Sequence, residues 1–97
     1  MAAKELPVPA TADVPGSHEV LRAFIVNGGL QVGMLRAFDK PEMWGLLLAD
    51  IARHAARIFA AEDRTGERQA LDKICDMFDA EMARPTDLGT TQAERKN

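Results

Sequence analysis

One cluster of polar side chains interrupts the most apolar stretch of the chain: Asp50, Arg53, His54 and Arg57, named here the charged wedge. On a helix, Asp50 would lie within one turn of both Arg53 and His54. The arginines could bind an anion, and a histidine beside a carboxylate could act as an acid–base pair. The same spacing is typical of a solvent-exposed ladder of ion pairs. We expect the ladder, because no nucleophile motif or glycine-rich phosphate loop accompanies the wedge.

The other groups capable of chemistry are few and scattered. His18 and His54 are the only histidines, and Cys75 is the only cysteine. Two separated histidines give a weak metal signal, so we expect no metal, no cofactor and no catalytic residue. Cys75 lies on the apolar stripe of a predicted helix, which predicts a buried, inert thiol. A single cysteine allows no intrachain disulfide, which fits a reducing compartment.

Two predicted helices carry the charged wedge and Cys75, whereas His18 lies in the N-terminal arm. Apolar residues recur every three or four positions over residues 39–63, with Asp39 as a plausible N-cap residue. A second helix is predicted over residues 66–83, with Thr65 as its cap, and Pro85 stops it. Its apolar stripe contains Leu71, Ile74, Cys75, Phe78 and Met82.

A β-hairpin is predicted before the helices. Two apolar runs, residues 20–26 and 30–35, flank Asn27-Gly28, the strongest signal for a two-residue turn. This turn opposes Ile25 with Leu30, Ala23 with Val32, and Leu21 with Met34, all on one face. A loop one residue longer would instead oppose Val26 with Leu30 and Phe24 with Val32. We prefer the first register.

The element order therefore predicts an α+β fold, with a two-stranded antiparallel hairpin followed by two antiparallel helices, in the order ββαα. Residues 1–17 hold Pro7, Pro9, Pro15 and Gly16, which predicts a flexible arm without regular helix. Residues 18–85 should form a single domain, on which the hairpin packs against the helix pair. Residues 86–97 are polar and small, and we expect a disordered tail.

The predicted elements carry more apolar surface than two layers can cover. Large apolar side chains take about half the circumference of the first helix, beside a stripe of small residues. The hairpin is apolar on both faces, and a two-stranded sheet has two unpaired edges. Either the N-terminal arm or a second copy of the chain should cover the surplus. The candidate interface residues are Phe24, Val26, Trp44, Gly45, Ala49, Ala52 and Ala56. Core packing is the competing interpretation of Trp44.

Composition narrows the class of partner. The chain has 97 residues and a net charge of −3, whereas nucleic-acid-binding modules normally carry a basic surplus. Its longest uncharged apolar stretch, residues 43–49, is far below the ~20 residues that span a bilayer. The first five residues lack the apolar run of a secretory signal. We therefore expect a soluble, cytoplasmic protein that binds neither membrane nor nucleic acid.

Three segments, residues 21–32, 43–57 and 83–87, resemble a family of short alphaproteobacterial proteins catalogued as a domain of unknown function. The resemblance covers about residues 5–91 and implies no activity, cofactor or site residue. Our leading hypothesis is a non-enzymatic interaction or accessory module that forms a homodimer, with another cytoplasmic protein as a further possible partner. The alternative is a protein that binds a small ligand or anion at the charged wedge.

Overall fold

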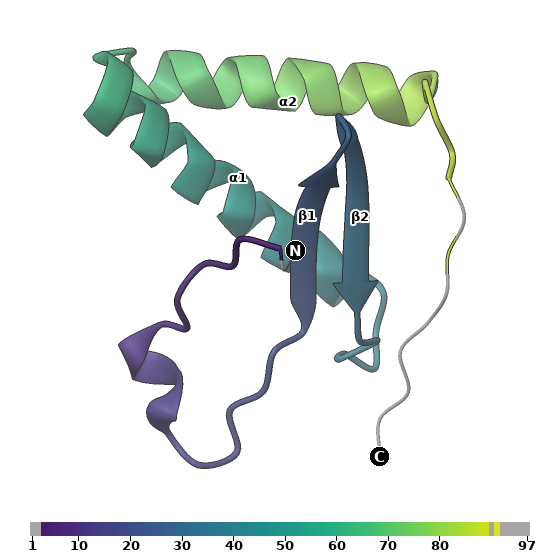
Figure 1. Ribbon diagram of the computed structural model, residues 1–97. Helices are drawn as coiled ribbons and strands as arrows, with labels where there is room; N and C mark the ends of the chain where they lie inside the picture. Colours follow the sequence, from purple (N-terminus) through teal and green to yellow (C-terminus); the bar gives the residue numbers. More distant parts are fainter. Residues whose placement is uncertain (1–2, 90, 92–97) are drawn as a thin grey trace. The chain divides into compact units, whose positions relative to one another are not determined.

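The computed structural model describes residues 3–89 and residue 91, and it divides into two compact units with the boundary after Ala37. The first unit holds the N-terminal arm, strand β1 (Leu21–Val26) and strand β2 (Gly29–Met34), and the second holds helix α1 (Glu42–Asp63) and helix α2 (Glu67–Ala83) (Figure 1). The predicted ββαα order and α+β class are confirmed. The boundary between the two units falls inside residues 18–85, the range predicted to form one domain. That these residues form a single domain stays a prediction.

The N-terminal arm is extended apart from one short helical turn and a reverse turn, in which the N–H of Ser17 donates to the carbonyl of Val14 at 3.1 Å. A 3-10 helix, η1 (Ala10–Asp13), follows Pro9, whose carbonyl accepts a hydrogen bond of 2.9 Å from the N–H of Ala12. The prediction that the prolines exclude regular helix here is wrong for these four residues. A proline just before a helix has the backbone angle that a first turn needs and loses no hydrogen bond there.

The hairpin has the register that the turn predicts. Ile25 opposes Leu30, Ala23 opposes Val32, and Leu21 opposes Met34. Asn27 and Gly28 both have positive φ angles, 52° and 81°, as a type I′ turn requires. The turn conformation, more than the apolar pattern, therefore selects this register over the longer loop.

Helix α1 begins at Glu42, three residues later than the predicted start. Pro41 stands at the N-cap position, so the assignment of Asp39 as the N-cap is wrong. The N–H groups of Met43 and Trp44 donate to the carbonyls of Lys40 and Pro41, which tightens the first turn. The helix ends at Asp63, and its C-cap residue, Arg64, is a non-glycine residue in the left-handed conformation, with φ 58°.

Helix α2 follows after a short reversal, with Gly66 rather than Thr65 at its N-cap position. The two helices run in opposite directions and diverge from this reversal (Figure 1). At the far end of α2, Glu81 accepts hydrogen bonds from the backbone N–H and the hydroxyl of Thr86. Of the predicted disordered tail, residues 90 and 92–97 lie outside the described residues.

The interior of the described chain is very small. Its buried apolar residues are Ala56 on α1 and Ala70 on α2, with exposed fractions of 0% and 6%. Two alanines let helix axes approach closely, since interaxial distance follows the size of the contact side chains. On α2, after Ala70, Leu71 and Ile74 are half-buried, and the remaining residues of the predicted apolar stripe are exposed. Among the helices of the described residues, none is long and apolar enough to cross a membrane.

Candidate functional site

The charged wedge lies on α1 as predicted, and its arginines are paired with carboxylates. Arg53 lies 3.5 Å from Asp50, one turn back on the same helix. Arg57 lies 3.7 Å from Glu67, in the first turn of α2. Each of these side chains is about half exposed. With two carboxylates neutralising two guanidinium groups, the arrangement matches a surface ion-pair ladder better than an anion site.

The Arg57–Glu67 pair joins the two helices across their reversal, and the helical spacing within α1 did not predict it. The signal was present, since Glu67 begins the second predicted helix. A carboxylate in the first turn of a helix also interacts favourably with the helix dipole. This pair therefore ties the start of α2 to α1 instead of holding a ligand.

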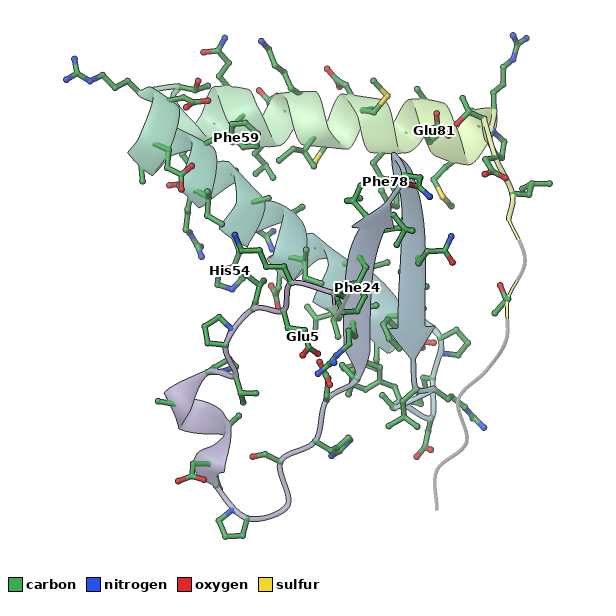
Figure 2. All side chains as sticks on the ribbon, in the orientation of Figure 1. Glu5, Phe24, His54, Phe59, Phe78 and Glu81 are labelled. Carbon is green, nitrogen blue, oxygen red and sulfur yellow. The ribbon has the colours of Figure 1, made fainter. Side chains whose placement is uncertain are left out.

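His54 projects from α1 on the side away from α2 (Figure 2), two residues before the buried Ala56. Its side chain is exposed. The other histidine, His18, belongs to the arm, where its Nδ1 lies 3.3 Å from the carbonyl of Gly16. Within residues 3–89 and 91, no group of three His, Cys, Asp or Glu side chains could hold a metal ion.

Cys75 is exposed, so the prediction of a buried thiol is wrong. The physical reason is the divergence of the helices. Leu71 and Ile74 of the α2 stripe are half-buried, whereas the next stripe residues, Cys75 and Phe78, are exposed. Amphipathic spacing predicts which side of a helix is apolar. It does not predict how many residues on that side are in contact with the partner helix.

The candidate interface residues of α1 fall into two groups. Gly45 and Ala49 are exposed, as an interface requires of a single copy. Ala52 is half-buried and Ala56 is fully buried, so Ala56 belongs to the interior of the chain and does not fit the interface assigned to it. Part of the stripe of small residues on α1 therefore packs against α2 and lets the two helices lie close together.

Trp44 is half-buried and packs against another aromatic residue. Its ring centroid lies 5.5 Å from that of Phe38, with an interplanar angle of 77°. This edge-to-face geometry is one of the preferred arrangements of aromatic pairs. The structure thus supports the core-packing interpretation of Trp44 at the start of α1. Because Trp44 is only half-buried, its role in an interface stays a prediction.

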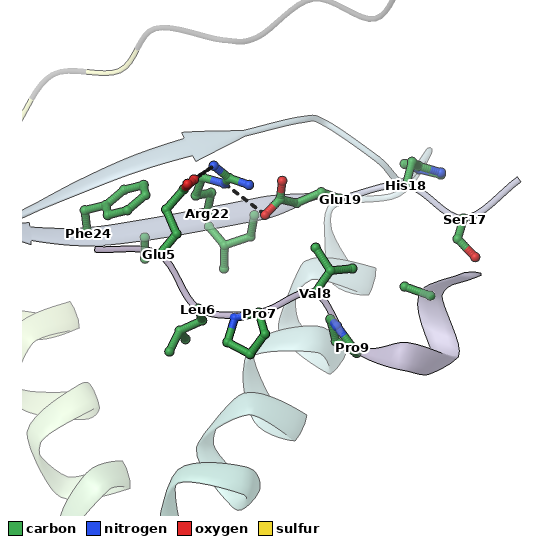
Figure 3. A pocket seen from close by; sticks show the side chains of 13 residues that line it. Glu5, Leu6, Pro7, Val8, Pro9, Ser17, His18, Glu19, Arg22 and Phe24 are labelled. Carbon is green, nitrogen blue, oxygen red and sulfur yellow. Dashed lines mark hydrogen bonds and ion pairs between the residues drawn. The ribbon is translucent and has the colours of Figure 1, made fainter. Parts of the chain in front are cut away.

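On the hairpin, the arm folds back along β1. Arg22 of β1 forms ion pairs with Glu5 of the arm and, at 3.1 Å, with Glu19 (Figure 3). Glu19 and Glu5 raise the pKa of Arg22 above its ordinary value, Glu19 through a hydrogen bond and its charge, Glu5 mainly through its charge. Between arm and strand lies an open cavity of about 480 Å³ that Leu6, Val8 and Phe24 help to line. Apart from the opposite charges of the two residues, nothing in the sequence predicts the Glu5–Arg22 contact.

The arm does not cover the hairpin's apolar side chains. Leu6 is 92% exposed, and Val8 and Val14 are also exposed, although Phe24 is half-buried. Val26, near the turn, remains exposed as well. Of the two proposed covers for the surplus apolar surface, the arm therefore leaves most of it open.

Both helices also carry exposed apolar side chains. On α1 they are Met43, Leu46, Leu48, Ile51, Ile58 and Phe59, and on α2 they are Met77, Phe78 and Met82. In the sequence, these residues both precede and follow the charged wedge. The surplus of apolar surface predicted from the sequence is thus present in the described residues.

Comparisons with known proteins agree with the resemblance found in the sequence. No curated protein matches this chain. A solved structure from the photosynthetic bacterium Rhodopseudomonas palustrus CGA009, provisionally named a pyruvate dehydrogenase, is 49% identical with a TM-score of 0.79. The match covers 97% of this chain and 98% of that one. A family model described as a domain of unknown function (DUF5076) matches residues 5–86, and the chain therefore belongs to the DUF5076 family.

Proposed function

We propose that this protein is a non-enzymatic interaction or accessory module that works as a homodimer. One observation carries the proposal: within the described residues no large side chain is fully buried, and the buried residues are two alanines. A folded domain normally hides several large aliphatic or aromatic side chains in its core. This chain has such residues in quantity and leaves them half-exposed.

The energetics favour a partner that covers many side chains at once. Covering the exposed half of a Leu, Ile or Phe side chain contributes on the order of 1 kcal/mol. Association itself costs roughly 4–15 kcal/mol in lost freedom of motion. An interface has to cover about ten such side chains to be stable, and two copies of this chain together offer that many on their helices.

A second copy is the preferred partner for two reasons. The arm, the other candidate cover, keeps its own apolar side chains in solvent. Symmetric dimers are also the commonest assemblies of soluble proteins. The net charge of −3 makes nucleic acid a poor alternative. We place the protein in the cytoplasm, where the exposed thiol of Cys75 would stay reduced.

The test uses a charge placed on the exposed part of the small-residue stripe. We expect Ala49→Glu to lower the mass seen by light scattering, at tens of micromolar, from about two chains towards one, because the new carboxylate must be desolvated in the interface. The matched control is His54→Glu, an exposed position in the charged wedge of the same helix, which should keep the two-chain mass. A wild-type mass of one chain contradicts the proposal.

The provisional name of the structural relative leads to a different expectation. If that name applied to this chain, the purified protein would oxidise pyruvate when supplied with the usual cofactors of such enzymes. Our proposal predicts no turnover of pyruvate above a blank without protein. Turnover that persists through repurification would contradict the non-enzymatic assignment.

A further inference from the structure

The two edges of the hairpin present hydrogen-bonding groups to the outside. The N–H of Leu35 donates to the carbonyl of Val20 at 3.0 Å, and the pairing continues from there in register. In an antiparallel pair, directly opposed residues alternate between hydrogen-bonded and non-hydrogen-bonded positions. The backbone groups of Leu21, Ala23 and Ile25 therefore point outward from β1, and those of Leu30, Val32 and Met34 point outward from β2.

The chain's own arm flanks the outer edge of β1, with the open cavity between the two. The arm runs beside β1 on the side away from β2 (Figures 1 and 3) and is held there by the Glu5–Arg22 ion pair. The cavity between them is lined by consecutive β1 residues, from Leu21 to Phe24, together with arm residues. Covering an edge with a loop and placing charges on it are two ways in which proteins prevent strand pairing.

Among the described residues of the first unit, neither a covering loop nor a charge protects the outer edge of β2. No other strand pairs with it among the described residues, and β2 contains no charged residue and no proline. Leu30 and Val32 are 64% and 48% exposed. An edge strand of six residues that carries no charge and no proline is a template for another strand.

We infer that β2 pairs antiparallel with β2 of a second copy, giving a four-stranded sheet in the order β1-β2-β2-β1. This inference rests on the proposed homodimer and adds the β2 edge to its contact surface, which in that proposal already includes the exposed part of the small-residue stripe on α1. The outward-pointing residues are evenly spaced around Val32, so a two-fold axis at Val32 pairs Val32 with its own copy and Leu30 with Met34. A copy of β2 brings no like charge to this edge, which makes the strand complementary to itself.

The pairing also joins the apolar faces of the two hairpins. Leu21, Ala23 and Ile25 lie on the same face as their partners Met34, Val32 and Leu30. A two-fold axis perpendicular to the sheet keeps these side chains on one face in both copies. The four strands then present one continuous apolar surface in place of two separate marginal hairpins.

Hydrogen exchange measured on the intact chain tests the inference without a mutation. At a concentration where light scattering gives two chains, the outward amides of Leu30, Val32 and Met34 should exchange about a hundredfold more slowly than those of Leu21, Ala23 and Ile25. Equally fast exchange at both edges in a two-chain species would overturn the β2 pairing and leave the homodimer standing. A one-chain mass would overturn both.

Proline variants provide a second readout. Val32→Pro removes an outward N–H from β2 without removing a bond to β1, and we expect the mass to fall from two chains to one. The matched control is Ala23→Pro, directly opposite on β1, which removes an outward N–H from the other edge and should leave the two-chain mass unchanged. A Val32→Pro protein that keeps its helical circular dichroism and its two-chain mass would overturn the inference. If Val32→Pro does not fold, the exchange measurement decides.

Discussion

At the scale of single residues, the charged wedge shows what spacing can predict. The Asp50–Arg53 pair follows directly from the helical repeat and is confirmed at 3.5 Å. The partner of Arg57 could not be predicted in this way, because Glu67 lies on the next helix. Their meeting depends on how the chain reverses after Arg64, whose left-handed conformation has no signature in the sequence.

Removing the wedge arginines should have a small effect on stability. Arg53→Ala and Arg57→Ala each delete a half-exposed ion pair, so we expect each to lower the free energy of unfolding by less than about 1 kcal/mol. Urea denaturation measures this. Inorganic phosphate should not raise the melting temperature of the wild type. A phosphate-dependent rise that both alanine variants abolish would restore the anion-binding hypothesis.

At the scale of elements, turn chemistry predicted more than helix caps did. The Asn27-Gly28 turn fixed the whole hairpin register, because a two-residue loop with two positive φ angles allows only one alignment. The start of α1 was predicted too early. Asp39 is a favourable N-cap residue by type, but Pro41 takes the N-cap position, and a proline is tolerated at the N-terminal end of a helix. The exposure of Cys75 was not predicted, because an apolar stripe on one helix does not indicate how many of its residues the neighbouring helix contacts.

The hairpin turn gives the second prediction at this scale. Gly28→Ala places a Cβ at φ 81°, and we expect it to cost roughly 1–2 kcal/mol in unfolding free energy. Gly33→Ala is the matched control within the same hairpin, because an added Cβ there meets nothing within 4 Å and φ is not positive. Urea denaturation at equal protein concentration compares the two. Equal destabilisation by both substitutions would contradict the assigned turn.

At the scale of the whole molecule, the sequence predicted an excess of apolar surface but not its exact location. Ile58 and Phe59 on α1 are exposed as that excess requires, whereas Ala56 proved to be interior. A helical wheel counts apolar positions without knowing which neighbour covers them. For the same reason the pattern could suggest a second copy but could not choose among its possible contact surfaces.

The most direct test of the account is sedimentation equilibrium of the full chain from one to a hundred micromolar. A single copy has a mass of 10.6 kDa. We predict a mass approaching twice that value as concentration rises, with a melting temperature that rises in parallel, because dimer formation stabilises the fold by mass action. A mass of one chain throughout, with cooperative unfolding at a melting temperature independent of concentration, would contradict the claim that one copy cannot cover its own apolar surface.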